Sequence, residues 1–125
     1  MNAKLFQLRM PSNDQPILMK PYFQAKFDGD LGSGFTWGLF QYVADIACRD
    51  LEDAFYISNN PEGRDMSSWF KPVGKHRPYS MSVGDLVLFE DKLFRCDPVG
   101  WKEITDKHAI ASVNILVNER DLEYA

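Results

Sequence analysis

The sequence has few cysteines, few histidines and no long hydrophobic run, and each shortage excludes a class of protein. Two cysteines in 125 residues are too few for the disulfide framework of a small secreted domain. The two histidines, with no CxxC or HxxxH pair, argue against a zinc site. The longest apolar runs have four or five residues, whereas a membrane-spanning helix needs about 20. We therefore expect a cytoplasmic protein that uses no membrane, metal or cofactor, with Cys48 and Cys96 packed as free thiols.

Motifs of known enzyme chemistry are missing as well. The sequence contains no P-loop, no dinucleotide-binding fingerprint and no nucleophile elbow. Nothing near either cysteine resembles the base and oxyanion hole that cysteine–histidine catalysis requires. We therefore expect a protein without catalytic residues. A small hydrolase or a ligand-sequestering protein is the alternative, and a deep pocket with converging polar groups would favour it.

The length and composition predict one folded domain that spans residues 1–125, because 45% of the residues are hydrophobic and 14% are aromatic. The net charge of −4 is unevenly distributed. Residues 28–66 hold eight acidic and two basic residues, whereas residues 67–84 hold three basic and no acidic ones. Such a distribution is typical of solvated faces, or of separate acidic and basic patches on an interaction surface.

The first half of the chain alternates between strand and turn patterns. Residues 6–10 and 23–28 show apolar–polar alternation, which predicts two strands that can pair as a hairpin. A glycine-rich loop is expected over residues 28–34, followed by a strand over residues 40–48. Asp50 is then a predicted N-cap with Asp53 in the capping-box position, so that a short helix covers residues 50–59 and ends before Pro61.

The second half predicts an antiparallel meander. Turn residues at 82–85, 90–92 and 97–100 separate three short apolar segments, which end at Ile104. The alternation of residues 111–117 favours a further strand, with a helix as the alternative. The expected fold is α+β and rich in β-structure: an antiparallel sheet or a partly open small barrel with one short helix, over about residues 50–59, packed on it.

The irregular segment 62–79 is the candidate functional region, because a long loop in a compact domain is usually functional or mobile. It combines aromatic with basic side chains, which suit either an interface with a protein or the stacking and neutralisation of a nucleic acid. The aromatic residues can instead fold back as a lid on the core. The candidate partner-binding residues are Trp69, Phe70, Lys71, Lys75, Arg77 and Tyr79. The acidic residues Glu52, Asp53, Glu62 and Asp65 form a second candidate patch.

Two segments of the chain carry a recognisable series of motifs: DLEDAF at 50–55, Trp69, Ser80, SVGD at 82–85, FRC at 94–96 and GWKEI at 100–104. In this order they resemble the YodL-like domains and related small proteins of bacteriophages and mobile elements. The resemblance covers about half of the chain and supplies no catalytic residues. It implies a phage or mobile-element protein in the cytoplasm of a bacterial host, with a role in host takeover or counter-defence.

The residues and the resemblance together predict a non-enzymatic protein that binds a host protein and inhibits or redirects it. A nucleic-acid-binding accessory protein is the alternative, and it predicts binding that weakens steeply with salt.

Overall fold

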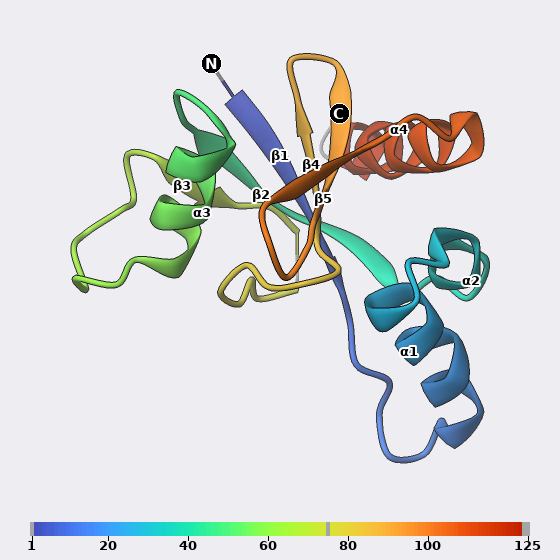
Figure 1. The fold of residues 1–125 in the computed structure, drawn as a ribbon. Coiled ribbons are helices and arrows are strands. Elements are labelled where there is room, and N and C mark those ends of the chain that lie inside the picture. Colours follow the sequence, from blue (N-terminus) through green and yellow to red (C-terminus); the bar gives the residue numbers. More distant parts are fainter. Residues whose placement is uncertain (1, 75, 124–125) are drawn as a thin grey trace.

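The computed structural model describes residues 2–74 and 76–123 and shows a single twisted antiparallel sheet with helices on both faces (Figure 1). Six strands form the sheet in the order β3-β2-β1-β4-β5-β6. The strands are β1 (Asn2–Leu8), β2 (Phe40–Ala47), β3 (Phe70–Pro72), β4 (Leu86–Phe89), β5 (Lys92–Cys96) and β6 (Trp101–Ile104). The helices are the short 3-10 helix η1 (Pro16–Leu18), then α1 (Met19–Phe27), α2 (Leu31–Thr36), α3 (Leu51–Asn59) and α4 (Lys107–Glu123).

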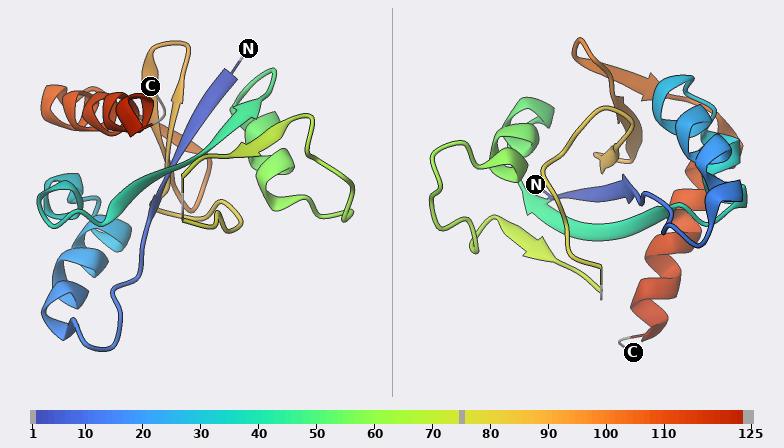
Figure 2. Two further views of the ribbon diagram at one scale, coloured as in Figure 1. Left: turned by 180° about the vertical axis from the view of Figure 1, so that it is seen from behind. Right: turned by 90° about the horizontal axis from the view of Figure 1, so that it is seen from below.

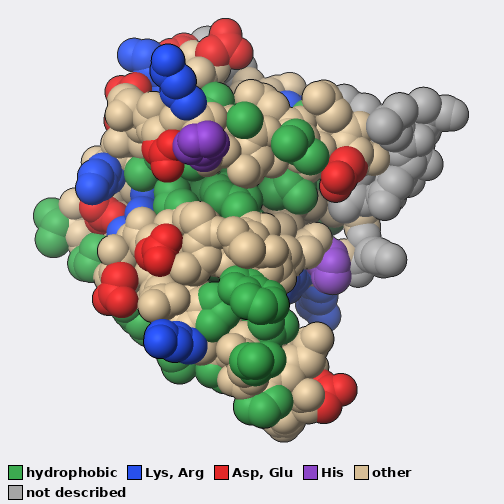
Figure 3. Space-filling model, turned by 90° about the vertical axis from the view of Figure 1, so that its right-hand side faces the viewer, with side chains coloured by type: hydrophobic (Ala, Val, Ile, Leu, Met, Phe, Trp, Pro, Cys, Tyr) green, Lys and Arg blue, Asp and Glu red, His purple; other side chains and the backbone are tan. Residues whose placement is uncertain are grey.

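One face of the sheet is covered by α1, α2 and α4 (Figure 2). Alternate residues of a strand point to opposite faces, and Phe6 and Leu8 of β1 pack here with Phe40 and Tyr42 of β2. The helices contribute a further set of buried residues: Tyr22, Ala25, Leu31, Ala109 and Val113. Hydrophobic side chains also gather on the outer surface of this side of the molecule (Figure 3). The exposed hydrophobic residues in or next to the helices that cover this face are Ile17, Phe23, Phe27, Trp37 and Ile115.

The opposite face carries α3. Ala3 and Leu5 of β1 and Ile46 of β2 pack there against Ala54 and Ile57 of α3. The β1–β2 register shifts between Leu5 and Phe6, so that Val43 is the extra residue of a β-bulge. In Figures 1 and 2, α3 and the loop after it lie at one end of the molecule, away from α1 and α2.

The predicted fold class is confirmed: the protein is a β-rich α+β domain built on an open antiparallel sheet. The meander prediction is also confirmed, because β4, β5 and β6 are consecutive antiparallel neighbours. The predicted helix over residues 50–59 is α3, and Asp50 caps it by accepting a hydrogen bond from the backbone N–H of Asp53. The expectation of one helix is wrong, since three further α-helices cover the other face.

The strand and hairpin predicted over residues 23–28 are wrong, because this segment lies in α1 and β1 pairs with β2 instead. Pro21, Tyr22 and Ala25 are the buried residues of α1, a spacing that fits a helix, whereas Phe23 and Phe27 are exposed and stack on each other. The apparent alternation arose from counting these two exposed rings as core residues.

The strand predicted over residues 111–117 is also wrong, and the helical alternative is what the structure shows in α4. Asp106 accepts a hydrogen bond from the backbone N–H of His108 at 2.9 Å, at the start of the helix. Ala109 and Val113 are fully buried, while Ile115 is 55% exposed, so the inward face has a spacing of four residues.

The glycine-rich loop predicted over residues 28–34 ends earlier than expected, because α2 begins at Leu31 with Asp30 as its N-cap. Glycine is required at position 34 for packing rather than for a turn. A Cβ atom there would lie 2.5 Å from the Phe40 ring and 3.1 Å from the Cβ of Ala25.

The SVGD turn at residues 82–85, which precedes β4, is hydrogen-bonded to β1 through Asp85 and Gln7. Asp85 is 1% exposed, and its Oδ2 accepts hydrogen bonds from Gln7 Nε2 and from the backbone N–H of Ser82, both at 2.9 Å. Gly84 has a φ of +95°, and a Cβ atom at this position would lie 3.2 Å from the backbone of Lys26. The turn therefore has structural reasons for its glycine and its aspartate.

Candidate functional site: the Trp69 cleft

The candidate site is built on α3 and the loop that follows it. Asp53, in the first turn of α3, accepts a hydrogen bond at 3.0 Å from the backbone N–H of Arg49. The helix ends at Asn60, whose φ of 43° turns the chain back along α3. This local geometry places residues 60–69 beside the end of β2.

The loop over residues 60–69 is fastened by its own hydrogen bonds. The side chain of Asn60 donates to the carbonyl of Arg64 at 2.7 Å and accepts from the N–H of the same residue at 2.9 Å. The backbone N–H of Trp69 donates to the carbonyl of Met66 at 2.9 Å, and the N–H of Ala47 donates to the carbonyl of Trp69 at 2.7 Å. The wall that carries Trp69 is therefore held before any partner binds.

Between α3, the end of β2 and this loop lies a cleft of about 620 Å³, here called the Trp69 cleft. Its apolar lining includes Met66 and the buried Cys48 and Ile57. Two aromatic side chains are partly exposed at its surface, Trp69 at 50% and Tyr56 at 37%. The complete lining is Ala47, Cys48, Arg49, Asp53, Tyr56, Ile57, Arg64, Asp65, Met66 and Trp69.

The charged groups of the cleft are engaged with one another. Arg49 Nε lies 3.5 Å from Asp53 Oδ2, and Arg64 forms an ion pair with Glu62. The Tyr56 hydroxyl donates a hydrogen bond at 2.7 Å to Glu62, and this bond raises the pKa of the tyrosine. Hydrogen bonds from Ser67 lower the pKa of Asp65, so this carboxylate is ionised at neutral pH.

Cys48 is the thiol of the cleft, and its environment disfavours the nucleophilic form. Burial raises its pKa, and the negative charge of Asp53 raises it further. A reactive cysteine needs the opposite, a lowered pKa in positively charged surroundings. The arrangement is therefore suited to binding by apolar contact and charge rather than to thiolate catalysis.

Five of the six residues singled out from the sequence lie in the described part of the chain, and these five do not share one surface. Trp69 lines the cleft, while Phe70 is half-buried against the core beneath α3. Lys71 is exposed on β3 directly opposite Asp45 of β2. Cross-strand partners share a face of the sheet, and Ile46, the neighbour of Asp45, packs against α3, so Lys71 lies on the other face.

Of the remaining three predicted residues, Arg77 and Tyr79 are not part of the cleft lining. Arg77 is exposed, and its carbonyl accepts a hydrogen bond at 2.6 Å from Arg9 Nη2. Tyr79 is 37% exposed, its hydroxyl donates to the carbonyl of Leu8, and the Arg9 guanidinium lies over its ring. Lys75 lies outside the described residues.

The acidic patch predicted from the sequence contributes residues to the cleft lining, whereas the predicted basic residues Lys71 and Arg77 do not. Asp53 and Asp65 line it, and Glu62 contacts both Tyr56 and Arg64. Sequence reasoning missed the lining residues Arg49, Tyr56, Arg64 and Met66. The available signal was the helical spacing of Asp53 and Tyr56 in α3, which puts them on adjoining positions of one surface.

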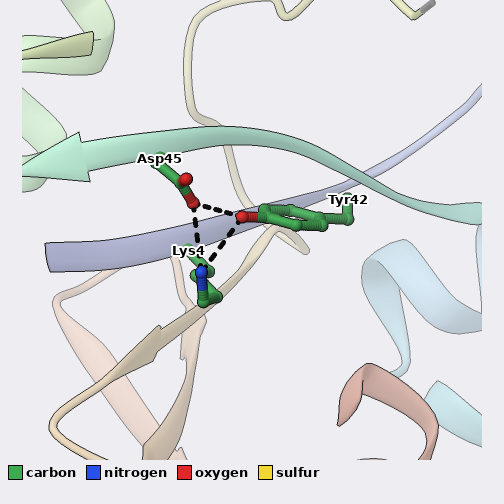
Figure 4. Close-up of polar contacts among 3 residues, drawn as sticks. All are labelled: Lys4, Tyr42 and Asp45. Carbon is green, nitrogen blue, oxygen red and sulfur yellow. Dashed lines mark hydrogen bonds and ion pairs between the residues drawn. The ribbon is translucent and has the colours of Figure 1, made fainter. Parts of the chain in front are cut away.

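A second polar cluster lies on the other face of the sheet (Figure 4). Lys4 Nζ lies 3.1 Å from the Tyr42 hydroxyl and 3.4 Å from Asp45 Oδ1, and the Tyr42 hydroxyl donates to the same carboxylate. Because Asp45 is opposite Lys71, this cluster and Lys71 lie on the same face. It bridges β1 and β2 at the surface of the sheet and does not line the Trp69 cleft.

Within residues 2–74 and 76–123, no three His, Cys, Asp or Glu side chains are arranged to hold a metal ion. None of the helices in this part of the chain has the length and hydrophobicity needed to cross a membrane.

No protein-family model, no curated protein and no solved structure matches this chain. The resemblance to YodL-like domains therefore stays a prediction, and the functional argument depends on the geometry of the site.

Proposed function

We propose that this protein binds another protein by accommodating an apolar side chain of its partner in the Trp69 cleft. The observation that carries the proposal is the half-exposed Trp69 ring on a wall fixed by main-chain hydrogen bonds. Tryptophan, tyrosine and arginine are the usual anchors of protein interfaces, and methionine is enriched there. The cleft combines all four in Trp69, Tyr56, Arg49, Arg64 and Met66.

The energetics suit a binding site. A tryptophan side chain buries about 200 Å² or more when it is covered, and about half of Trp69 is exposed. Covering about 100 Å² of apolar surface contributes about 2–3 kcal/mol. Because the loop is already hydrogen-bonded, little further conformational entropy is lost on binding.

The two alternative functions find less support at this site. Nucleic-acid binding requires cations that are available beside exposed aromatic rings. The two arginines of the cleft, Arg49 and Arg64, are paired with Asp53 and Glu62, and Asp65 adds a further negative charge, whereas Lys71 lies on the other face of the sheet. A hydrolase requires an activated group, and the pKa of Cys48 is raised. That the partner is a host protein, which a phage or mobile-element protein inhibits or redirects, is what the resemblance implies, and it remains a prediction.

The experiment uses Trp69→Ala, with Trp37→Ala as its matched control. Trp37 is 53% exposed at the end of α2, at the other end of the molecule. All three proteins are used as baits in bacterial lysate, and a protein captured by the wild type is purified for calorimetry. We expect Trp69→Ala to weaken binding of the purified partner by about 2–3 kcal/mol, or roughly 30- to 150-fold in affinity. We expect Trp37→Ala to have little effect on this affinity. Equal binding of the partner to the wild type and Trp69→Ala would overturn the proposal.

A further inference from the structure

We infer that the partner presents a basic segment with two apolar anchors, one in the Trp69 cleft and one in a second hollow on the other side of α3. This inference rests on the proposed function and specifies the chemistry of the partner. The second hollow, of about 180 Å³, is here called the Trp101 hollow. It is lined by Glu52, Phe55, Cys96, Asp97, Gly100 and Trp101.

A third hollow connects the two sites. It has a volume of about 390 Å³, lies at the first turns of α3, and is here called the Asp50 hollow. It shares Arg49, Asp53 and Tyr56 with the Trp69 cleft and shares Glu52 with the Trp101 hollow. The three hollows therefore adjoin one another across the N-terminal half of α3, and together they are here called the α3 path.

The aromatic side chains along this path are placed as two separate anchors. Trp69 and Tyr56 stand at one end, and Phe55, which is 40% exposed, stands with the half-buried Trp101 at the other. Tyr56 and Phe55 are neighbours on the exposed side of α3, whose buried residues are Ala54 and Ile57. A partner that crosses α3 therefore meets apolar surface on both sides of the helix.

The charge along the path selects a basic partner. The three hollows are lined by two arginines and five carboxylates, a net charge of −3; the carboxylates are Asp50, Glu52, Asp53, Asp65 and Asp97. Two charged residues outside the lining are paired with lining residues, Glu62 with Arg64 and Arg95 with Asp97. Their opposite charges cancel, so they leave the net charge unchanged. The positive end of the α3 dipole offsets about half a charge, which leaves the path negative. Complementary charge therefore favours lysine and arginine between the two anchors.

The edge strand beside the cleft argues against binding by strand addition. The β2–β3 register directs the N–H and C=O groups of Lys71 towards β2, so the outward backbone groups belong to Phe70 and Pro72. The N–H of Phe70 already donates to Met66, and Pro72 has no N–H. An added strand would find no donors on β3, so the partner is recognised through its side chains.

The test uses a displayed library of random 12-residue peptides as the probe. The wild type serves as bait, and peptides that still bind Trp69→Ala are removed. We expect the remaining peptides to carry at least two Lys or Arg residues and two separated apolar side chains. The best synthetic peptide should lose at least tenfold in affinity for Phe55→Ser and for Glu52→Lys. Phe23→Ser, which replaces a ring that is 45% exposed on α1, is the matched control and should change the affinity less than twofold.

The outcomes separate the two proposals. This inference would be overturned if the peptides whose binding depends on Trp69 were neutral or acidic. It would also be overturned if basic peptides bound Phe55→Ser and Glu52→Lys as tightly as the wild type. Either result would leave the proposed function intact. If no peptide depends on Trp69, the proposed function is overturned and the inference with it. Circular dichroism melting of each variant confirms that a loss of affinity is not a loss of folding.

Discussion

Asp85 offers a quantitative test of the fold, because its carboxyl group is buried and its hydrogen-bond partners within residues 2–74 and 76–123 include no cation. Its Oδ2 accepts two hydrogen bonds, and its Oδ1 lies 3.5 Å from the Tyr79 hydroxyl, which also donates to the carbonyl of Leu8. Burial raises the pKa of Asp85 from 3.8 to about 6, against smaller opposing effects from Ser82, Gln7 and Lys26.

The raised pKa fixes the sign of the pH dependence. Between pH 3.8 and about 6, the unfolded chain loses the Asp85 proton while the folded protein keeps it. The unfolded state then binds fewer protons, so the contribution of this group to the free energy of unfolding falls as the pH rises. A shift of about two units corresponds to a loss of about 3 kcal/mol, which is complete above the folded pKa.

The perturbation is Asp85→Asn, which keeps the shape and cannot ionise. Urea denaturation of both proteins is measured from pH 4 to pH 8, and the free energy of unfolding of the wild type is subtracted from that of the variant. We expect this difference to rise by about 2 kcal/mol between pH 4 and pH 6.5 and then to level off, because part of the unfolded-state titration already lies below pH 4. Asp14→Asn is the control, because a hydrogen bond from Ser12 lowers the pKa of Asp14, so its titration lies below this pH range and its difference should stay nearly flat from pH 4 to pH 8. A flat or falling difference for Asp85→Asn would refute the reasoning.

Two further predictions concern the helices. Gly34→Ala should lower the free energy of unfolding by about 1–3 kcal/mol, because the new methyl group overlaps the Phe40 ring. The matched control is Gly32→Ala, whose Cβ meets its nearest neighbour at 3.6 Å, and it should change the free energy of unfolding by less than about 1 kcal/mol. Urea midpoints that fall equally for both variants would contradict the packing argument. Asp50→Ala should lower the free energy of unfolding by about 1 kcal/mol through the loss of the α3 N-cap, and Asp50→Asn should lower it by only about a few tenths of a kcal/mol. Identical thermal unfolding of the alanine variant and the wild type would show that the cap contributes nothing.

The elements that could be predicted from the sequence are those with local signals. The N-cap at Asp50 and the turns of the meander depend on residues close in sequence, and Glu90 and Asp91 do adopt the positive φ values of a tight hairpin turn. The segments in α1 and α4 were predicted as strands because their apolar residues fit both the two-residue spacing of a strand and the spacing of about four residues of a helix. Which spacing is correct depends on which of these apolar residues the rest of the fold buries. That choice is made by tertiary contacts of Ala25 and Val113, which no local pattern reveals.

The candidate site was predictable only in part, for the same reason. Trp69 stood out as an aromatic residue in an irregular segment, but its neighbours in the cleft come from the end of β2 and from α3, up to 22 positions earlier in the chain. The sequence suggested a shared surface for Trp69 and Lys71 because they are only two positions apart in the chain. In the folded protein Lys71 lies opposite Asp45 and outside the cleft lining, and α3 supplies Tyr56 and Asp53 as the neighbours of Trp69 instead.

The most direct test of the central claim is a backbone amide chemical-shift map of the ¹⁵N-labelled protein, titrated with the captured partner or the selected peptide. We expect the largest shifts at residues 47–49, 53–57 and 64–69, which surround the Trp69 cleft, with α1 and α2 unchanged. Shifts concentrated on residues 17–37, with the cleft residues unchanged, would contradict the assignment of recognition to this site.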